Sequence, residues 1–152
     1  DSDIDQLKKT KAEQLIVQLQ QIITYAQMQS IAENQAVTVC PLDASNTCMD
    51  HWSQKISVFT DTDKLHKLND AGTLLKTMDK QAHLSGVLKF SAFSSARYLT
   101  LTPLGLMGQQ NGTFIYCENI GTEQIHYGLS ISKTGRTRLL WQNDPYFQEA
   151  KR

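Results

Sequence analysis

The sequence predicts an α+β fold in which one long N-terminal helix is followed by several antiparallel strands. Two observations carry this prediction. Residues 3–34 contain no Gly or Pro, and their apolar side chains recur close to the helical period of 3.6. After residue 34, short alternating segments recur at intervals of roughly ten residues, with turn residues between them. A long helix followed by strands of this kind is an α+β arrangement.

The helix over residues 3–34 is expected to have two unlike halves. Its first turns are strongly polar, and the apolar stripe strengthens from Leu15 onward. We therefore expect the second half to pack on the domain and the first half to extend beyond it, with a frayed N-terminus as the alternative. The apolar positions of the stripe are Ile4, Leu7, Leu15, Leu19, Ile22, Ile23 and Ala26.

The strands are predicted from alternation and from the residues that bound them. The first covers residues 36–40 and stops at Pro41, and a polar loop over residues 41–54 follows. In the next strand, over residues 55–60, Ile56 and Val58 are expected on one face. The other predicted strands cover residues 72–76, 86–90, 98–102, 113–117, 124–131 and 136–141, with turns at 104–105 and 109–112.

Length and charge limit the possible functions. The 152 residues predict a single domain, made of the helix over 1–34, a β-rich part over 35–140 and a C-terminal tail over 141–152. Lys+Arg and Asp+Glu number 15 each, so the net charge is zero. This balance excludes a chain-wide electrostatic grip on nucleic acid, and any polyanion site needs a local cluster of charge.

The start of the chain is abrupt. No stretch approaches 18 consecutive apolar residues, and no signal peptide is visible. Because Asp1-Ser2-Asp3 leads directly into the helical pattern, we expect a truncated or processed product.

No enzyme, metal site or cofactor is predicted. Asp61 and Asp63 sit together in Asp-Thr-Asp after a strand, which is more typical of a turn than of an acid–base pair. Nucleophile, phosphate-loop and dinucleotide motifs are missing from the sequence. The histidines fit no zinc spacing; they are His51, His66, His83 and His126.

The three cysteines leave several arrangements open. Cys40, Cys48 and Cys117 fit one disulfide and one free thiol, or three reduced thiols, and composition alone slightly favours the reduced state. If a disulfide forms, Cys40 can pair with Cys48 across a short loop or with Cys117 on another strand. The sequence does not choose between these pairings.

The C-terminal segment LSISKTGRTRLLW, residues 129–141, is the strongest candidate for a binding site. It carries Lys133, Arg136 and Arg138 and no acidic residue, and Thr134-Gly135 marks a turn. On a strand, the spacing of two residues directs both guanidiniums to one face, where they can hold successive phosphates. The alternative is a pair of charges that protects an exposed edge strand from pairing.

Other residues near the C-terminus can contribute to this site. Lys151 and Arg152 add positive charge, which Asp144 and Glu149 partly offset. Two aromatic side chains can stack on bases; they are Trp141 and Tyr146.

Several motifs together resemble the FimT/FimU (GspH-like) family of minor type IV pilins, and FimT most of all. TVCPLDASNTC, Trp52 and SVFTDTD resemble the segment that follows the long helix in that family. TFIYC resembles a later strand that ends in Cys, and SISKTGRTRL resembles the C-terminal Gly-Arg-x-Arg segment. The resemblance extends from the helix to about residue 140.

The resemblance implies a helix laid against antiparallel sheets and a set of partners. Such proteins are made as prepilins, and a hydrophobic half-helix, absent here, anchors them in the inner membrane and later in the pilus core. The globular part is periplasmic and then extracellular, which favours a disulfide over free thiols. Other minor and major pilins are the implied protein partners.

The family that the sequence resembles includes members with two different roles. FimT-like members bind DNA through the Gly-Arg-x-Arg tail during natural transformation, and Gly135, Arg136 and Arg138 match that motif. FimU- and GspH-like members initiate or cap the filament, and some of them carry a similar motif. A third possibility, apart from the resemblance, is an unrelated cytosolic α+β protein with three free thiols.

Overall fold

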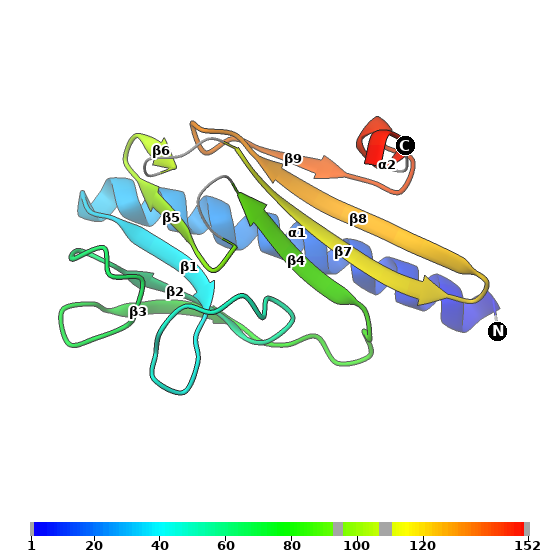
Figure 1. Ribbon diagram of the computed structural model, residues 1–152, viewed down its shortest axis with the longest axis horizontal. Coiled ribbons are helices and arrows are strands. Elements are labelled where there is room, and N and C mark those ends of the chain that lie inside the picture. The colour runs from blue at the N-terminus through cyan, green and yellow to red at the C-terminus, as the bar shows by residue number, and fades with distance from the viewer. Residues whose placement is uncertain (1, 93–95, 107–110, 151–152) are drawn as a thin grey trace.

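In the computed structural model, which describes residues 2–92, 96–106 and 111–150, one long helix lies along two antiparallel sheets (Figure 1). The predicted α+β fold with its N-terminal helix packed on antiparallel sheets is confirmed. In chain order the elements are α1 (Ser2–Glu33), β1 (Val37–Pro41), β2 (Ile56–Thr60), β3 (Leu74–Met78), β4 (Val87–Ala92), β5 (Leu99–Thr102), β6 (Gly105–Leu106), β7 (Gly112–Ile120), β8 (Glu123–Ile131), β9 (Thr137–Leu140) and α2 (Pro145–Ala150).

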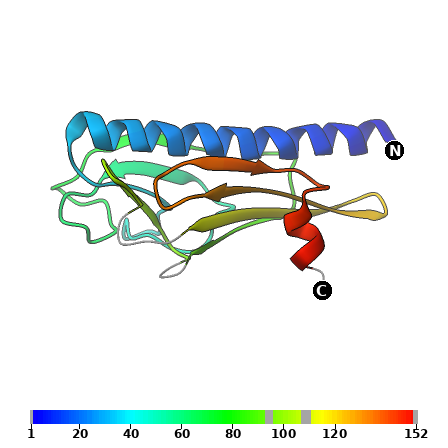
Figure 2. The same ribbon diagram turned by 90° about the horizontal axis from the view of Figure 1, so that it is seen from above.

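The strands divide into two sheets. The first sheet has the order β3-β2-β1-β5-β6, and the second has the order β4-β7-β8-β9. Every pairing between these strands is antiparallel. Helix α1 contacts β1, β2 and β5 of the first sheet and β7, β8 and β9 of the second, so it joins the two sheets into one core. Figure 2 shows α1 on one side of the sheets and α2 on the other.

The apolar stripe of α1 explains this packing. The buried positions follow one another at steps of three and four residues, which places them on one face of the helix. Each is less than a tenth exposed; they are Ala12, Leu15, Ile16, Leu19, Ile22, Ile23 and Ala26. The expectation that the second half of the helix packs on the domain is confirmed.

The first turns of α1 are less isolated than expected. Ile4 and Leu7 are exposed, as a projecting segment requires. However, the turn between β7 and β8 reaches back along these residues: Lys9 forms a 3.6 Å ion pair with Glu123, and a Cβ on Gly121 would lie 2.8 Å from the carboxylate of Asp5. The β7–β8 hairpin therefore accompanies the first half of the helix (Figure 1).

Three details of the strands differ from the prediction. Strand β2 was predicted from alternation, with Ile56 and Val58 on one face, yet all five of its residues are buried. The loop over residues 41–54 lies beside the other face, at Ser57. Strand β3 begins two residues later than predicted. Gly105, expected in a turn, starts the short strand β6. Of the predicted turn over residues 109–112, residues 109 and 110 lie outside the described residues, and Gly112 begins β7.

The tail after residue 141 contains a helix that was not predicted. Asp144 accepts a hydrogen bond from the Tyr146 amide at 2.9 Å and so caps the first turn of α2. Phe147 is 5% exposed and its ring lies 5.6 Å from that of His126, so α2 covers part of the second sheet on the side away from α1. Asp before Pro is a common start signal for a helix, and it is present in the sequence.

Candidate functional site

The basic residues of the C-terminal segment are presented by the turn between β8 and β9. The Ser132 amide donates to the Arg136 carbonyl at 2.7 Å, and the Arg136 amide donates to the Ser132 hydroxyl at 3.1 Å. Gly135 has a φ of +90°, and a Cβ there would lie 2.6 Å from the Gln27 side chain of α1. Glycine is thus required both by the backbone conformation and by the close approach of α1.

Arg136 and Arg138 occupy different settings. Arg138 lies within β9, opposite Ser130 of β8, whereas Arg136 precedes the strand and belongs to the turn. The neighbouring Thr137 hydroxyl accepts from Gln20 of α1 at 3.0 Å, so Arg138 points to the face of the sheet away from α1. The prediction that both guanidiniums share one face assumed that both arginines lie on a strand. Only Arg138 does, and the position of Arg136 is set by the turn.

Arg138 has a partner that the sequence analysis noted only as an offsetting charge. Its guanidinium donates to Oδ2 of Asp144 at 2.8 Å. The Arg138 side chain is 61% exposed and that of Asp144 is 14% exposed. The hydrogen bond from the Tyr146 amide and the ion pair with Arg138 both lower the pKa of Asp144 below its usual value. Asp144 thus stays ionised and holds Arg138 against the start of α2.

Lys133 and Arg136 are the cations of the segment that have no ion-pair partner among the described residues. Both are exposed, and within the described ranges no carboxylate lies within the 4.0 Å ion-pair distance of either. Strand β9 is an edge strand, since it pairs only with β8. The segment is therefore open to an approaching anion from the turn and from the strand edge. Lys151 and Arg152, also predicted to bind, lie outside the described residues.

The two aromatic candidates lie on opposite sides of the second sheet. Trp141 packs edge-on against Tyr127 at 5.8 Å, and it lines a groove beside Gln14 and Val17 of α1. It is therefore on the helix side, away from Arg138. Tyr146 is 39% exposed on α2, next to Asp144. Of the two rings, Tyr146 is the one on the same side as Arg138.

The cysteines are resolved into one disulfide and one free thiol. Cys40 and Cys48 are bonded, with their Cα atoms 5.6 Å apart, and Cys117 is free. The alternative pairing of Cys40 with Cys117 is therefore wrong, as is the fully reduced arrangement. An antiparallel bridge between Leu42 and Cys48 brings the two ends of this loop together.

A buried polar cluster surrounds Asp61, which had been predicted only as part of a turn. Its Oδ2 accepts from the Thr38 hydroxyl at 2.7 Å and lies 3.4 Å from Nδ1 of His66. The same Nδ1 is 3.3 Å from the Thr100 hydroxyl. Because the acid and the hydroxyl meet one nitrogen of His66, the ring does not relay a proton between them as it does in a catalytic triad. The cluster ties β1, β5 and the loop after β2 together.

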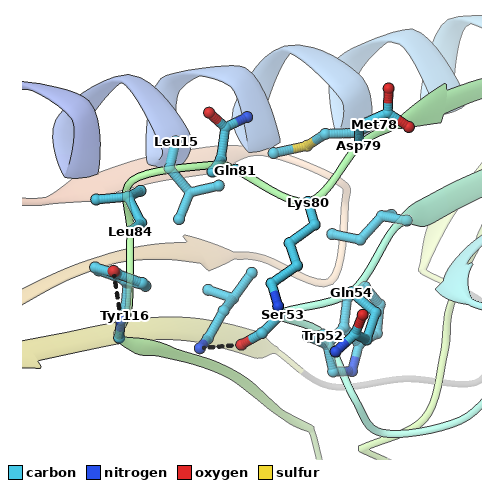
Figure 3. Close-up of a pocket in the computed structure, with 13 residues that line it drawn as sticks. Leu15, Trp52, Ser53, Gln54, Met78, Asp79, Lys80, Gln81, Leu84 and Tyr116 are labelled. Carbon is cyan, nitrogen blue, oxygen red and sulfur yellow. Dashed lines mark hydrogen bonds between the residues drawn. The ribbon is translucent and has the colours of Figure 1, made fainter.

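The pocket shown in Figure 3 is small. It lies between α1, the loop around Trp52 and the segment that leads into β4, and its volume is about 40 Å³. The Leu88 amide donates to Ser53 at 3.0 Å and the Gly86 amide to Tyr116 at 3.0 Å on its walls. This volume accommodates one or two waters rather than a substrate.

Two further observations concern the described part of the chain. It contains no cluster of three or more His, Cys, Asp or Glu side chains able to hold a metal ion. Nor does it contain a helix that has both the length and the apolar character needed to span a bilayer.

Comparisons with known proteins agree with this architecture. The family model described as type II transport protein GspH matches residues 16–135. Two crystal structures of the type IV minor pilin FimU from Pseudomonas aeruginosa PAO1 are similar in fold. One has a TM-score of 0.63 and 22% identity, covering 86% of this chain and 88% of that chain. The other has a TM-score of 0.59 and 23% identity, covering 84% and 90%. A search of curated proteins gave no match.

Proposed function

This chain belongs to the family of the type II transport protein GspH, and we propose that it is a minor pilin that binds DNA non-specifically through its basic C-terminal turn. The proposal has two parts that separate experimentally. The first is a filament subunit that assembles with other minor and major pilins. The second is the contact between Lys133, Arg136 and Arg138 and the phosphate backbone of DNA taken up for natural transformation.

The subunit role is supported by the long helix and its exposed apolar residues. Large apolar side chains that are exposed together can mark a surface that another protein covers. Four on α1 are more than half exposed; they are Ile4, Leu7, Met28 and Ile31. In this role, the protein is anchored in the inner membrane with its globular part in the periplasm, and it later becomes part of a pilus.

The DNA contact is supported above all by Lys133 and Arg136. They are exposed on one turn, and no described carboxylate is paired with either. Phosphate contacts by Lys and Arg provide affinity without sequence preference, which fits uptake of unrelated DNA. Arg138 is the weaker member because Asp144 already neutralises part of its charge.

A titration with random-sequence duplex DNA at two salt concentrations tests the DNA contact. With about three phosphate contacts, log K falls against log salt with a slope of about −2.7, so affinity drops roughly 40-fold between 50 and 200 mM salt. The Arg136→Ala/Arg138→Ala protein is expected to lose most of this binding. Lys55→Ala/Lys80→Ala is the matched control, because both lysines are exposed and lie around the first sheet.

The competing candidate is a structural subunit without DNA binding, which primes or caps the filament. It is favoured by the Arg138–Asp144 ion pair, since a charge engaged internally is less available to DNA. This candidate predicts equal, negligible binding by the wild-type and the double variant. It also predicts that Met28→Glu/Ile31→Glu reduces incorporation into filaments while the isolated protein stays folded.

A further inference from the structure

The second sheet has an outer face, which we define as the side chains of β4, β7, β8 and β9 that point away from α1. Successive strand residues alternate between the two faces. Phe90, Phe114 and Leu129 are buried against the core, so their neighbours in sequence lie on the outer face. This face includes Lys89, Ser91, Thr113, Cys117, Ser130 and Arg138.

Carboxylates are segregated from this outer face. The four strands carry two, Glu118 and Glu123. Glu118 is 4% exposed on the inner face, where it accepts from the Tyr116 hydroxyl at 2.6 Å. Glu123 turns toward α1 and pairs with Lys9. Among the described strand residues, the outer face thus carries Lys89 and Arg138 with no acid between them, and Asp144 is the acid that adjoins it at β9.

A row of hydroxyl groups connects the two cations across the sheet. Arg138 pairs with Ser130, Ser130 with Thr113, and Thr113 with Ser91, in consecutive strands. Ser91 is exposed, and the other two hydroxyl residues are half-buried. Lys89 is exposed two residues before Ser91, on the same face. Hydroxyl side chains commonly donate to phosphate oxygens, so such a row complements a nucleic-acid backbone.

Helix α2 leaves this row open. It covers the neighbouring part of the outer face, where Leu140 is fully buried and Phe147 lies against His126. At the β4 edge, by contrast, Val87 is 51% exposed, and a shallow groove runs past Lys89, Cys117 and Gln124. Among the described residues, the half-buried Ser130 and Thr113 and the exposed Ser91 thus connect the basic turn with the exposed Lys89.

We propose that DNA bound at the basic turn continues across the outer face of the second sheet, along the hydroxyl row, to a second phosphate contact at Lys89. This inference rests on the proposed DNA binding, and it adds a site from a strand far from the C-terminus in sequence. Three strand spacings of about 4.8 Å and two residue steps of about 3.4 Å separate Lys89 from Arg138 by roughly 16 Å. That span exceeds the major-groove width of about 12 Å, so both strands of a duplex can be contacted.

Substitution of Lys89 tests the path directly. Removal of one phosphate contact makes the salt slope shallower by about 0.9. For equal affinities at 1 M salt, the variant therefore binds roughly eightfold more weakly than the wild type at 0.1 M salt. We expect this loss for Lys89→Ala and no change for Lys55→Ala, an exposed lysine beside the first sheet. Thr113→Glu, which places a carboxylate in the middle of the row, is expected to weaken binding further.

The free thiol of Cys117 provides a second readout on the same face. Lys89 and Cys117 line the same shallow groove. Burial raises the pKa of the thiol, and the charge of Lys89 opposes the rise. Alkylation of Cys117 by N-ethylmaleimide at mildly alkaline pH should slow severalfold when random duplex DNA is added. The protection should disappear in Arg136→Ala/Arg138→Ala.

The outcomes separate the path from the DNA proposal itself. If Arg136→Ala/Arg138→Ala loses binding while Lys89→Ala binds normally and Cys117 is unprotected, the path is wrong and the basic turn alone binds DNA. If the wild-type protein does not bind DNA at all, both are overturned. Protection of Cys117 by purified partner pilins but not by DNA would make the outer face a protein interface and would also overturn the path.

Discussion

The guanidinium of Arg138 and the carboxylate of Asp144 are joined by a 2.8 Å hydrogen bond that ties the basic segment to the C-terminal helix. The two oxygens of Asp144 have different tasks, because Oδ1 accepts from the Tyr146 amide and Oδ2 accepts from Arg138. Asp144 thus competes with any phosphate for Arg138. This competition gives the first two predictions.

Asp144→Asn is expected to strengthen DNA binding. Asparagine caps a helix as well as aspartate does, so α2 should persist while the competing charge is removed. Because exposed ion pairs are weak, the expected gain in affinity is roughly 1.4- to 5-fold. Titration with random duplex DNA measures this gain. Glu123→Gln, which breaks the exposed Lys9 pair, is the control for loss of a negative charge elsewhere.

Arg136→Ala is expected to weaken DNA binding more than Arg138→Ala. Arg136 is exposed without an ion-pair partner among the described residues, whereas Arg138 must leave Asp144 to contact phosphate. In the Asp144→Asn background the difference should shrink, because Arg138 is then fully available. A double-mutant cycle over Arg138 and Asp144 quantifies this. Equal losses in both backgrounds would contradict the competition.

Loss of the Cys40–Cys48 disulfide is expected to destabilise the fold by roughly 2–3 kcal/mol, the chain-entropy value for a loop of this size. The bond closes a loop with a sequence separation of eight, and both cysteines belong to the same buried hydrophobic core as Trp52. Urea unfolding of the Cys40→Ala/Cys48→Ala protein measures the change. Cys117→Ser, which removes the half-buried free thiol, should cost much less. Reductant should destabilise the wild-type protein and leave the double variant unaffected.

The helix and most strands could be predicted because their signals are local. The stripe from Leu15 to Ala26 repeats at the helical period, and β7 alternates between buried and more exposed residues along its length. Strand β2 was predicted over residues 55–60, close to its observed bounds, but its complete burial was not predicted. Its second face is covered by the loop over residues 41–54, and nothing within the strand encodes a cover that comes from elsewhere.

The candidate site was predictable in composition but not in its contacts. The cations and the turn at Gly135 follow from the sequence alone. The pairing of Arg138 with Asp144 depends on how the chain folds back after β9, and the placement of Lys89 on the same face depends on the order β4-β7-β8-β9. Both are tertiary relationships that sequence spacing does not contain.

His66 predicts a loss of stability in mild acid. Burial lowers its pKa, and the nearby Asp61 carboxylate only partly opposes the shift. The folded protein therefore binds a proton on His66 less readily than the unfolded chain, whose pKa is about 6.5. By linkage, the free energy of unfolding should fall as the pH drops through and below about 6.5, and this contribution should be constant above it.

Urea unfolding between pH 5 and 8 tests this assignment. His66→Asn should lose part of the acid dependence, and asparagine tolerates the positive φ of 58° at this position. His51→Asn, at an exposed histidine, should retain the wild-type profile. An identical pH profile in all three proteins would remove His66 as the cause.

Tyr116 and Glu118 give the last prediction, which concerns the segment leading into β4. Oε1 of Glu118 accepts from the amides of Ser85 and Gly86 at 2.6 and 2.8 Å and from the Tyr116 hydroxyl at 2.6 Å. Tyr116→Phe removes one donor from a buried carboxylate, and hydrogen bonds to charged groups contribute about 1.5–3 kcal/mol, so we expect a destabilisation of about that size.

Burial, and next the bond to Glu118, raise the pKa of Tyr116 above its usual value. The folded state therefore holds this proton more tightly, and stability should fall as the pH rises above about 10, where an unfolded tyrosine ionises. Urea unfolding at pH 7 and pH 10.5 measures both effects. Tyr116→Phe should be less stable than wild-type at pH 7 and should lose part of the alkaline decline, whereas a variant with wild-type stability at pH 7 would show that the phenol does not hold Glu118 in place.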